Sequence, residues 1–235
     1  MNNPKQLFLD VKIDKKKTLD SFISCDSTKV VLRALKEFCE EDSINQFLFL
    51  WGKPGVGKNY LLHSVHQEFL LKERTAAYIS FKKTNISSEK ILDNLSTLDL
   101  IILEGIEEYP LEDTWEVAFF NLINQSRATG TKILCSSKKV AKSIDFSLPD
   151  LVSRVLSFSA FELTDIKDEE KREALKNTIL RKGLNADENV ISYILNHTSR
   201  GLTDLLTLIS DLDSFSLEKK RRITIPLIKE MLSVN

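Results

Sequence analysis

The stretch that decides the fold is FLFLWGKPGVGKN, residues 47–59. Its first five residues form an uninterrupted apolar run, which is typical of a strand buried on both faces. The pattern GxxxxGK follows over residues 52–58, and apolar residues at helical spacing begin at Leu61. A strand, a glycine-rich turn and a helix in this order predict a loop whose backbone N–H groups wrap a phosphate.

The loop predicts a nucleotide ligand, ADP or ATP. Lys58 supplies a point charge for the β- and γ-phosphates, and the start of the helix adds partial positive charge. The alternative for the same pattern is a tight glycine turn that holds no ligand. The residues expected to contact the nucleotide are Gly52, Lys53, Pro54, Gly55, Val56, Gly57, Lys58 and Asn59.

One position of the loop departs from the usual pattern. Ser or Thr normally follows the lysine, and its hydroxyl binds Mg²⁺. Here the residue is Asn59, whose amide oxygen stands on a longer arm. The sequence therefore leaves Mg²⁺ binding open, and we assign no metal ligand.

An acidic strand end lies further along the chain. LIILEG at 100–105 is an apolar run that ends in a carboxylate, the form of a Walker B motif, and Glu104 is the candidate for orienting Mg²⁺ or its water. The next position, where many hydrolysing proteins carry a second acid, is Gly105. Glu107 and Glu108 follow, but the intervening turn is expected to point them elsewhere. The alternative is a strand that simply ends in solvent-facing acids.

Strand and helix patterns alternate as far as residue 162. After residues 47–51, the further strand candidates are 76–81, 98–103, 132–136 and 155–161. This alternation predicts a parallel sheet in a three-layer α/β/α domain. Only helical patterns follow. We therefore expect a flexible tail over 1–17, a nucleotide-binding core over 18–162 and a small all-helical lid over 163–235.

Composition excludes several classes of protein. The chain has 235 residues, of which 42% are hydrophobic and 29% charged, a globular balance. Its net charge of −1 lacks the basic excess of a stand-alone nucleic-acid binder. Cys25, Cys39 and Cys135 form no CxxC pair, and His63 with His66 has no third ligand, so no zinc site is indicated. No signal-like or membrane-spanning run is present, and we expect a cytoplasmic protein without membrane contact.

The order of these segments resembles the AAA+ core of the bacterial replication initiator DnaA. The resemblance rests on TLDSFI at 18–23, GKPGVGKN at 52–59, IILEGIEE at 101–108 and LPDLVSR at 148–154. The sequence ends after TIPLIKEML at 224–232, where DnaA continues into a helix-turn-helix DNA-binding domain. With QLFL at 6–9, the arrangement is similar to the Hda family of regulatory inactivators of DnaA.

This resemblance implies a negative regulator of DNA replication initiation that binds two proteins, the DNA polymerase sliding clamp and DnaA. Gln6, Leu7, Phe8 and Leu9 would bind the clamp, although Asp10 stands where the family motif often has proline or phenylalanine. Contact with DNA would be indirect, through the clamp. The alternative for this segment is a tail folded onto its own core. Formation of a homo-oligomer stays open.

The resemblance also implies that Arg154 is an arginine finger, acting in trans on ATP bound to DnaA. A guanidinium suits this role because it is planar, always charged and able to fork onto phosphate oxygens. From the residues alone, the alternative is an i, i+4 salt bridge with Asp150. The family's sensor 1 position falls on Ser136 or Ser137, and its lid arginine falls on Thr203, with Arg200 nearby as a substitute.

We therefore expect a regulatory protein that promotes ATP hydrolysis in its partner and has no ATPase activity of its own. Asn59, Gly105 and Thr203 motivate this expectation, because each replaces a group that hydrolysing relatives use. Two alternatives remain: a slow ATPase of the helicase-loader type, and a P-loop scaffold without activity.

Overall fold

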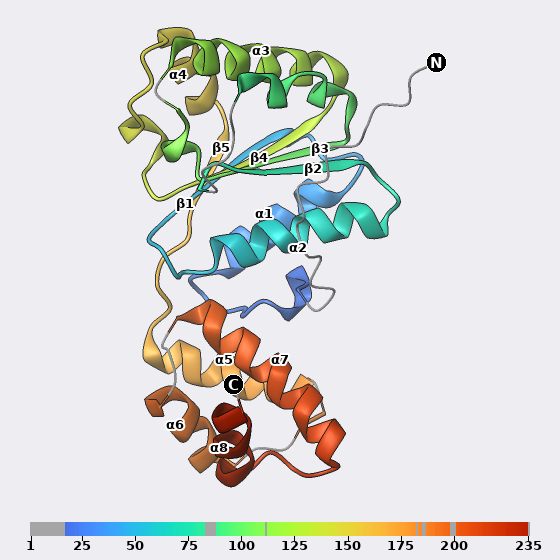
Figure 1. Ribbon diagram of the computed structural model, residues 1–235, viewed down its shortest axis with the longest axis vertical. Coiled ribbons are helices and arrows are strands. Elements are labelled where there is room, and N and C mark those ends of the chain that lie inside the picture. Colours follow the sequence, from blue (N-terminus) through green and yellow to red (C-terminus); the bar gives the residue numbers. More distant parts are fainter. Residues whose placement is uncertain are drawn as a thin grey trace.

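The computed structural model describes residues 17–82, 88–110, 112–181, 183–184, 187–197 and 201–234. Within these residues, a parallel sheet flanked by helices is followed by a group of helices only (Figure 1). The clamp-binding residues expected at Gln6, Leu7, Phe8 and Leu9 lie outside the described residues, as does Arg200.

The sheet has five parallel strands in the order β2-β3-β4-β1-β5. The strands are β1 (Phe47–Trp51), β2 (Ala76–Ser80), β3 (Leu100–Glu104), β4 (Lys132–Ser137) and β5 (Ser159–Glu162). Because β4 lies between β1 and β3, the carboxyl ends of these three strands share one edge of the sheet. The expected α/β class with a parallel sheet and a helical lid is confirmed.

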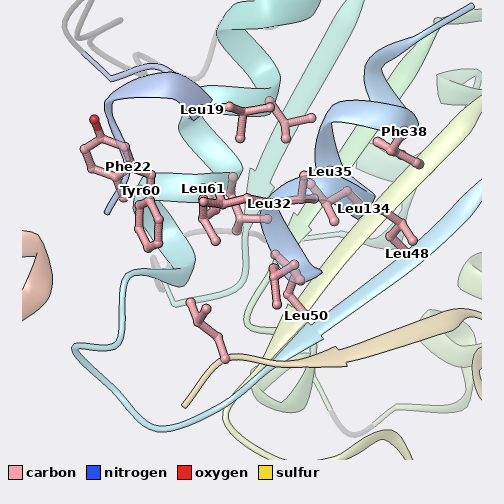
Figure 2. Packing of buried hydrophobic residues seen from close by; sticks show 14 of the residues in the cluster. Leu19, Phe22, Leu32, Leu35, Phe38, Leu48, Leu50, Tyr60, Leu61 and Leu134 are labelled. Carbon is pink, nitrogen blue, oxygen red and sulfur yellow. The ribbon is translucent and has the colours of Figure 1, made fainter. Parts of the chain in front are cut away.

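Helices cover both faces of the sheet, as the three-layer prediction requires (Figure 1). Helices α1 (Lys29–Cys39) and α2 (Lys58–Leu71) lie on one face, and α3 (Asp113–Thr129) and α4 (Pro149–Leu156) lie on the other. Each face has its own buried cluster. Figure 2 shows part of the first cluster, to which α1 contributes Leu35, α2 contributes Leu61, and the sheet contributes Leu48 and Leu134.

The fifth strand begins later than the sequence predicted. We expected it over 155–161, but Val155 lies in α4 and β5 begins at Ser159. The reason is local: Pro149 stands in the first turn of a helix, and Leu151 and Val155 are spaced i, i+4 so that both are buried. An apolar run of this length does not distinguish a helix from a strand by its pattern alone.

The lid consists of α5 (Asp168–Arg181), α6 (Glu188–His197), α7 (Leu202–Lys219) and α8 (Ile225–Val234). Its helices share a separate core. Thr224 caps α8: the Leu227 N–H donates to its Oγ1 at 3.4 Å. Ala174 of α5 belongs to the same buried cluster as Phe22, so the lid also packs on the core domain. No helix among the described residues is long and apolar enough to cross a bilayer.

A buried carboxylate fixes the start of α4. Glu116 of α3 is 3% exposed and accepts the backbone N–H groups of Ser147 and Leu148 at 2.9 and 2.6 Å. It also accepts the hydroxyl of Tyr109 at 2.5 Å. Burial alone would raise the pKa of Glu116, but these three hydrogen bonds outweigh it and lower the pKa. Leu148 provides no side-chain cap for α4, and Glu116 of a neighbouring helix instead fixes the two residues that lead into it.

We predict that Glu116→Ala lowers the free energy of unfolding by roughly 2–4 kcal/mol, because two N–H groups and a hydroxyl lose a charged acceptor. In thermal unfolding this corresponds to a fall in Tm of about 5–15 °C. Glu112→Ala is the matched control, since Glu112 is exposed and makes no side-chain cap for α3. Equal melting temperatures for the two variants would show that Glu116 does not hold the α3–α4 junction.

Candidate nucleotide site and arginine surface

The phosphate loop is anchored where it leaves β1. The Gly52 N–H donates to the Ser137 carbonyl at 3.2 Å, so the loop starts against the end of β4. Gly52 has φ +152°, and a Cβ placed there would lie 2.2 Å from the Leu163 carbonyl oxygen. Such an approach is possible only for glycine, so this position fixes the path of the loop between β4 and the segment after β5.

The tip of the loop is open to solvent and its base is buried. Lys53, Pro54 and Gly55 are exposed, whereas the Val56 side chain enters the first core cluster. Gly57 precedes α2 with φ 103° and has no side chain to occupy the first N–H groups of the helix. These donors are therefore available to a phosphate.

Lys58 is the buried cation of the site. Its side chain is 5% exposed, and Nζ donates to the carbonyl oxygens of Gly52 and Lys53 at 2.5 and 2.8 Å. Burial, followed by the nearby charge of Lys82, lowers the pKa of Lys58 to about 8. The hydrogen-bond partners of the ammonium are therefore neutral carbonyl groups, and a bound phosphate would stabilise its charge.

Glu104 ends β3 and is held on both oxygens. Oε1 pairs with Lys82 Nζ at 2.9 Å, and Oε2 accepts the hydroxyl of Tyr78 at 2.9 Å. Burial would raise the pKa of Glu104, but the hydrogen bond and charge of Lys82, with the hydroxyls of Tyr78 and Ser80, outweigh it and lower the pKa. Glu104 is therefore an ionised carboxylate facing the site, which differs from the alternative of a solvent-facing strand end.

Lys82 is a site residue that the sequence did not predict. It follows β2 by two positions, and its Nζ lies 3.5 Å from Asn59 Oδ1 as well as 2.9 Å from Glu104 Oε1. Asn59 and Glu104 belong to recognisable motifs, the phosphate loop and the acidic strand end, but no motif includes Lys82 itself. The signal that would have found it is the strand order, which places the end of β2 beside the end of β3.

Two of the groups at this site correspond to the positions that hold Mg²⁺ in P-loop proteins, the residue after the loop lysine and the acid at the strand end. Mg²⁺ requires an octahedral shell of oxygen ligands. Here the Asn59 and Glu104 oxygens both face the Lys82 ammonium. The side-chain arrangement therefore does not fit a metal ion.

The described residues contain no group of three or more His, Cys, Asp or Glu side chains that could hold a metal. The two histidines that lacked a third metal ligand in the sequence pack against the ring of Tyr78. His63 stacks on Tyr78 with ring centroids 4.7 Å apart, and His66 meets the same ring edge-on at 5.9 Å. A packing role therefore accounts for both.

The end of β4 brings polar groups next to Glu104. Ser136 pairs with Glu104 in the sheet register, and its Oγ lies 3.3 Å from the Gly105 N–H. Ser137 Oγ instead accepts the Lys139 N–H at 2.9 Å. Both expected sensor 1 candidates thus lie at the carboxyl edge of the sheet, with Ser136 beside the strand-end acid.

The acids that follow Gly105 are held by the residue after β4. Glu107 Oε1 accepts the Lys138 N–H at 3.0 Å, and Glu108 forms an ion pair with the Lys138 ammonium. Glu107 is nonetheless close enough for its charge to act on Lys58.

Thr203, the position at which the family has its lid arginine, lies in the first turn of α7, and its side chain is outside the description.

Arg154 lies on a different surface, formed by α3 and α4. Its guanidinium stands over the Phe120 ring, 5.8 Å from the centroid. Arg154 forms no ion pair with any described residue, so the salt bridge to Asp150, the alternative role for this arginine, is absent. An open hollow of about 300 Å³ surrounds it, lined by Phe120, Arg127, Asp150, Ser153, Arg154 and Ser157.

The loop between β1 and α2, the acid at the end of β3, the strand order and the helical lid define a P-loop protein of the AAA+ class. The family described as the bacterial DnaA ATPase domain matches residues 13–158, and the family described as the Hda lid domain matches residues 168–232. The chain therefore belongs to the bacterial DnaA ATPase-domain family and carries a lid of the Hda type.

The chain is also similar to individual proteins. An uncharacterized protein of Haemophilus influenzae is 30% identical over 231 residues, which cover 98% of this chain and 99% of that protein. DnaA from Aquifex aeolicus bound to AMPPCP superimposes with a TM-score of 0.69 at 20% identity, covering 88% of this chain and 68% of that one. Domain III of Thermotoga maritima DnaA superimposes with a TM-score of 0.70 at 16% identity, covering 94% of this chain and 97% of that one. At these identities the solved structures show a shared fold.

We predict that ADP affinity falls about tenfold between pH 7 and pH 9, because the Lys58 pKa of about 8 sets the fraction of protein that carries the ammonium. Phosphate binds the charged form, so affinity is lost as the pH rises through that pKa. The charges facing Lys58 are those of Lys82, Glu107, Lys138 and Glu104. Isothermal titration calorimetry across this range measures the slope.

Lys58→Arg is the control for this pH dependence, since a guanidinium stays charged throughout. Its affinity should stay level over the same range, whatever its absolute value. A wild-type affinity independent of pH, or an equal slope in the arginine variant, would assign the titration to another group.

Proposed function

We propose that this protein is a cytoplasmic regulatory adaptor that limits the initiation of DNA replication. It binds the DNA polymerase sliding clamp through Gln6 to Leu9, docks on ATP-bound DnaA and presents Arg154 to the nucleotide of its partner. The observation that carries the proposal is the Arg154 guanidinium, which is free of ion pairs with described residues and opens on a hollow.

The surroundings of Arg154 suit a protein partner. The Phe120 ring lies beside the guanidinium, 5.8 Å from its central carbon, a contact that leaves the N–H donors without a charged partner among the described residues. Val117, one helical turn before Phe120, is 48% exposed, and Leu156 on α4 is 53% exposed. Apolar side chains around an arginine anchor are common at interfaces. Arginine fingers supplied in trans accelerate phosphoryl transfer by roughly 10³–10⁵.

The nucleotide in the protein's own loop is structural in this proposal. Gly105 offers no side chain to polarise a water, and Glu104 is engaged by Lys82 and Tyr78. DnaA of Aquifex aeolicus was solved with AMPPCP, which supports nucleotide binding by this shared fold. Bound ADP would hold the loop, α2 and lid together, while the chemistry takes place in DnaA.

The family assignment supports the choice of partners. The core matches the DnaA ATPase domain and the lid matches the Hda lid domain. AAA+ domains of one family share complementary surfaces, so a DnaA-like domain is a suitable neighbour for DnaA itself. A solved DnaA bound to AMPPCP and single-stranded DNA shares the fold, but this chain reaches DNA only through the clamp in our proposal.

We predict that Arg154→Ala abolishes stimulation of ATP hydrolysis by DnaA, because the transition-state charge loses its cation. Phosphate release from ATP-bound DnaA, mixed with this protein and clamp-loaded DNA, should fall by about 10³-fold relative to wild type. Arg33→Ala is the matched control, since Arg33 is an exposed arginine on α1 that pairs with Glu37. Stimulation by Arg154→Ala equal to that by the control contradicts the finger assignment.

The same assay separates the rival functions. Phosphate release in the absence of DnaA that disappears in Lys58→Ala indicates a slow ATPase of the helicase-loader type. No release under any condition, together with no stabilisation by ADP in thermal unfolding, indicates an inactive scaffold, since a ligand held only by the folded state must raise Tm.

We predict that the double variant Gln6→Ala/Leu7→Ala loses clamp binding, because an extended peptide of this kind binds through an amide in a polar pocket and apolar anchors in a groove. Immobilised clamp should retain the wild-type protein and release the variant. Asn2→Ala/Asn3→Ala alters polar residues of the same segment and should bind normally. Equal retention of all three proteins excludes the Gln6–Leu9 motif.

A further inference from the structure

We infer that the phosphate loop holds a nucleoside diphosphate without a divalent cation, and that the Lys82 ammonium takes the place of the metal. This inference rests on the nucleotide binding proposed above and specifies how it occurs. It concerns the side chains of this chain alone and is independent of DnaA and the clamp.

Lys82 lies between the end of β3 and the start of α2. Its Nζ bridges Asn59 Oδ1 and Glu104 Oε1 at 3.5 and 2.9 Å, the two side chains between which a P-loop metal would lie. An ammonium carries three donors, and these two contacts leave one for a phosphate oxygen. The Lys82 side chain is 30% exposed, so its ammonium is not sealed in the core, and in the inferred site the remaining donor binds a phosphate oxygen.

The packing of Lys82 explains why a glycine stands at position 105. A Cβ at Gly105 would lie 3.1 Å from Lys82 Cγ and 3.3 Å from its Cε. Gly105 also has φ +72°, a conformation that favours glycine. A second acid at this position would therefore displace the lysine stem. The same side chain accounts for Asn59, because a carboxamide oxygen on a longer arm reaches the ammonium as an acceptor.

The site is already rich in positive charge. Lys58 and Lys82 bring two ammonium groups to one pocket, and the charge of Lys82 helps to lower the pKa of Lys58. A diphosphate between them relieves that repulsion. A divalent cation instead adds positive charge beside an ammonium that already neutralises Glu104. A magnesium-bound triphosphate is therefore the less suitable ligand.

Calorimetric titration with ADP, in EDTA and in saturating MgCl₂, tests the inference. The wild-type protein should bind ADP in EDTA, with an affinity that MgCl₂ leaves unchanged or weakens. The ADP affinity of Lys82→Met in EDTA should be about tenfold or more below that of the wild type, because one charge-assisted phosphate contact is lost. Adding MgCl₂ should make this variant bind ADP more tightly. Lys142→Met, which alters an exposed lysine on a short helical turn outside the site, should behave as wild type.

Two results would overturn the inference while leaving nucleotide binding intact. One is a tenfold or greater gain in wild-type ADP affinity on adding MgCl₂, which shows that Lys82 yields to the metal. The other is an unchanged ADP affinity of folded Lys82→Met in EDTA. Absence of ADP binding by the wild-type protein in both buffers rejects the proposed nucleotide site itself. The wild-type arm needs no substitution, so the test does not depend on the variant's folding.

Discussion

The parallel pairing of β4 with both β1 and β3 is the constraint on which the rest of the structure depends. It aligns the carboxyl ends of these strands, so the Gly52 N–H bonds to Ser137 and the Gly105 N–H bonds to Ser136. Two segments about fifty residues apart in sequence thereby face one another across β4. The loop cation and the strand-end acid come together because of this topology, as is usual at the carboxyl edge of open α/β sheets.

The balance of charge in the site follows from that alignment. Two unit charges 4 Å apart interact by about 4 kcal/mol near a protein surface, so each ion at this edge strongly biases its neighbours. Glu104 is already neutralised by Lys82, and Lys58 donates hydrogen bonds to carbonyl oxygens, with the charge of Glu107 nearby. The site therefore offers positive charge to an anion and little negative charge to a metal.

Much of the fold could be predicted from local patterns. The first strand, its loop and α2 were predicted because the apolar run, the glycines and the helical spacing adjoin one another. The fifth strand was placed too early because Val155 suits both a helix and a strand, and only Pro149 and the burial of Leu151 resolve the choice. Local pattern is weakest where an element is short.

The site was predictable only in part, for a related reason. The loop residues and Glu104 belong to contiguous motifs, whereas Lys82 joins them through the pairing of β2 with β3. Glu116, likewise, holds the start of α4 from a helix some thirty residues away. Neither contact has a signature in the sequence. Lysine and glutamate are common on protein surfaces, and only the tertiary fold brings Lys82 and Glu116 to their partners.

In the inferred site, Lys82 replaces a metal ion at the phosphate loop. A crystal structure of the protein with ADP, grown with Mn²⁺ and measured at an energy where manganese scatters anomalously, tests it directly. We predict no anomalous peak between Asn59 and Glu104, with Lys82 Nζ within hydrogen-bonding distance of a phosphate oxygen. A manganese peak at that position, with Lys82 turned away from Glu104, would contradict the claim.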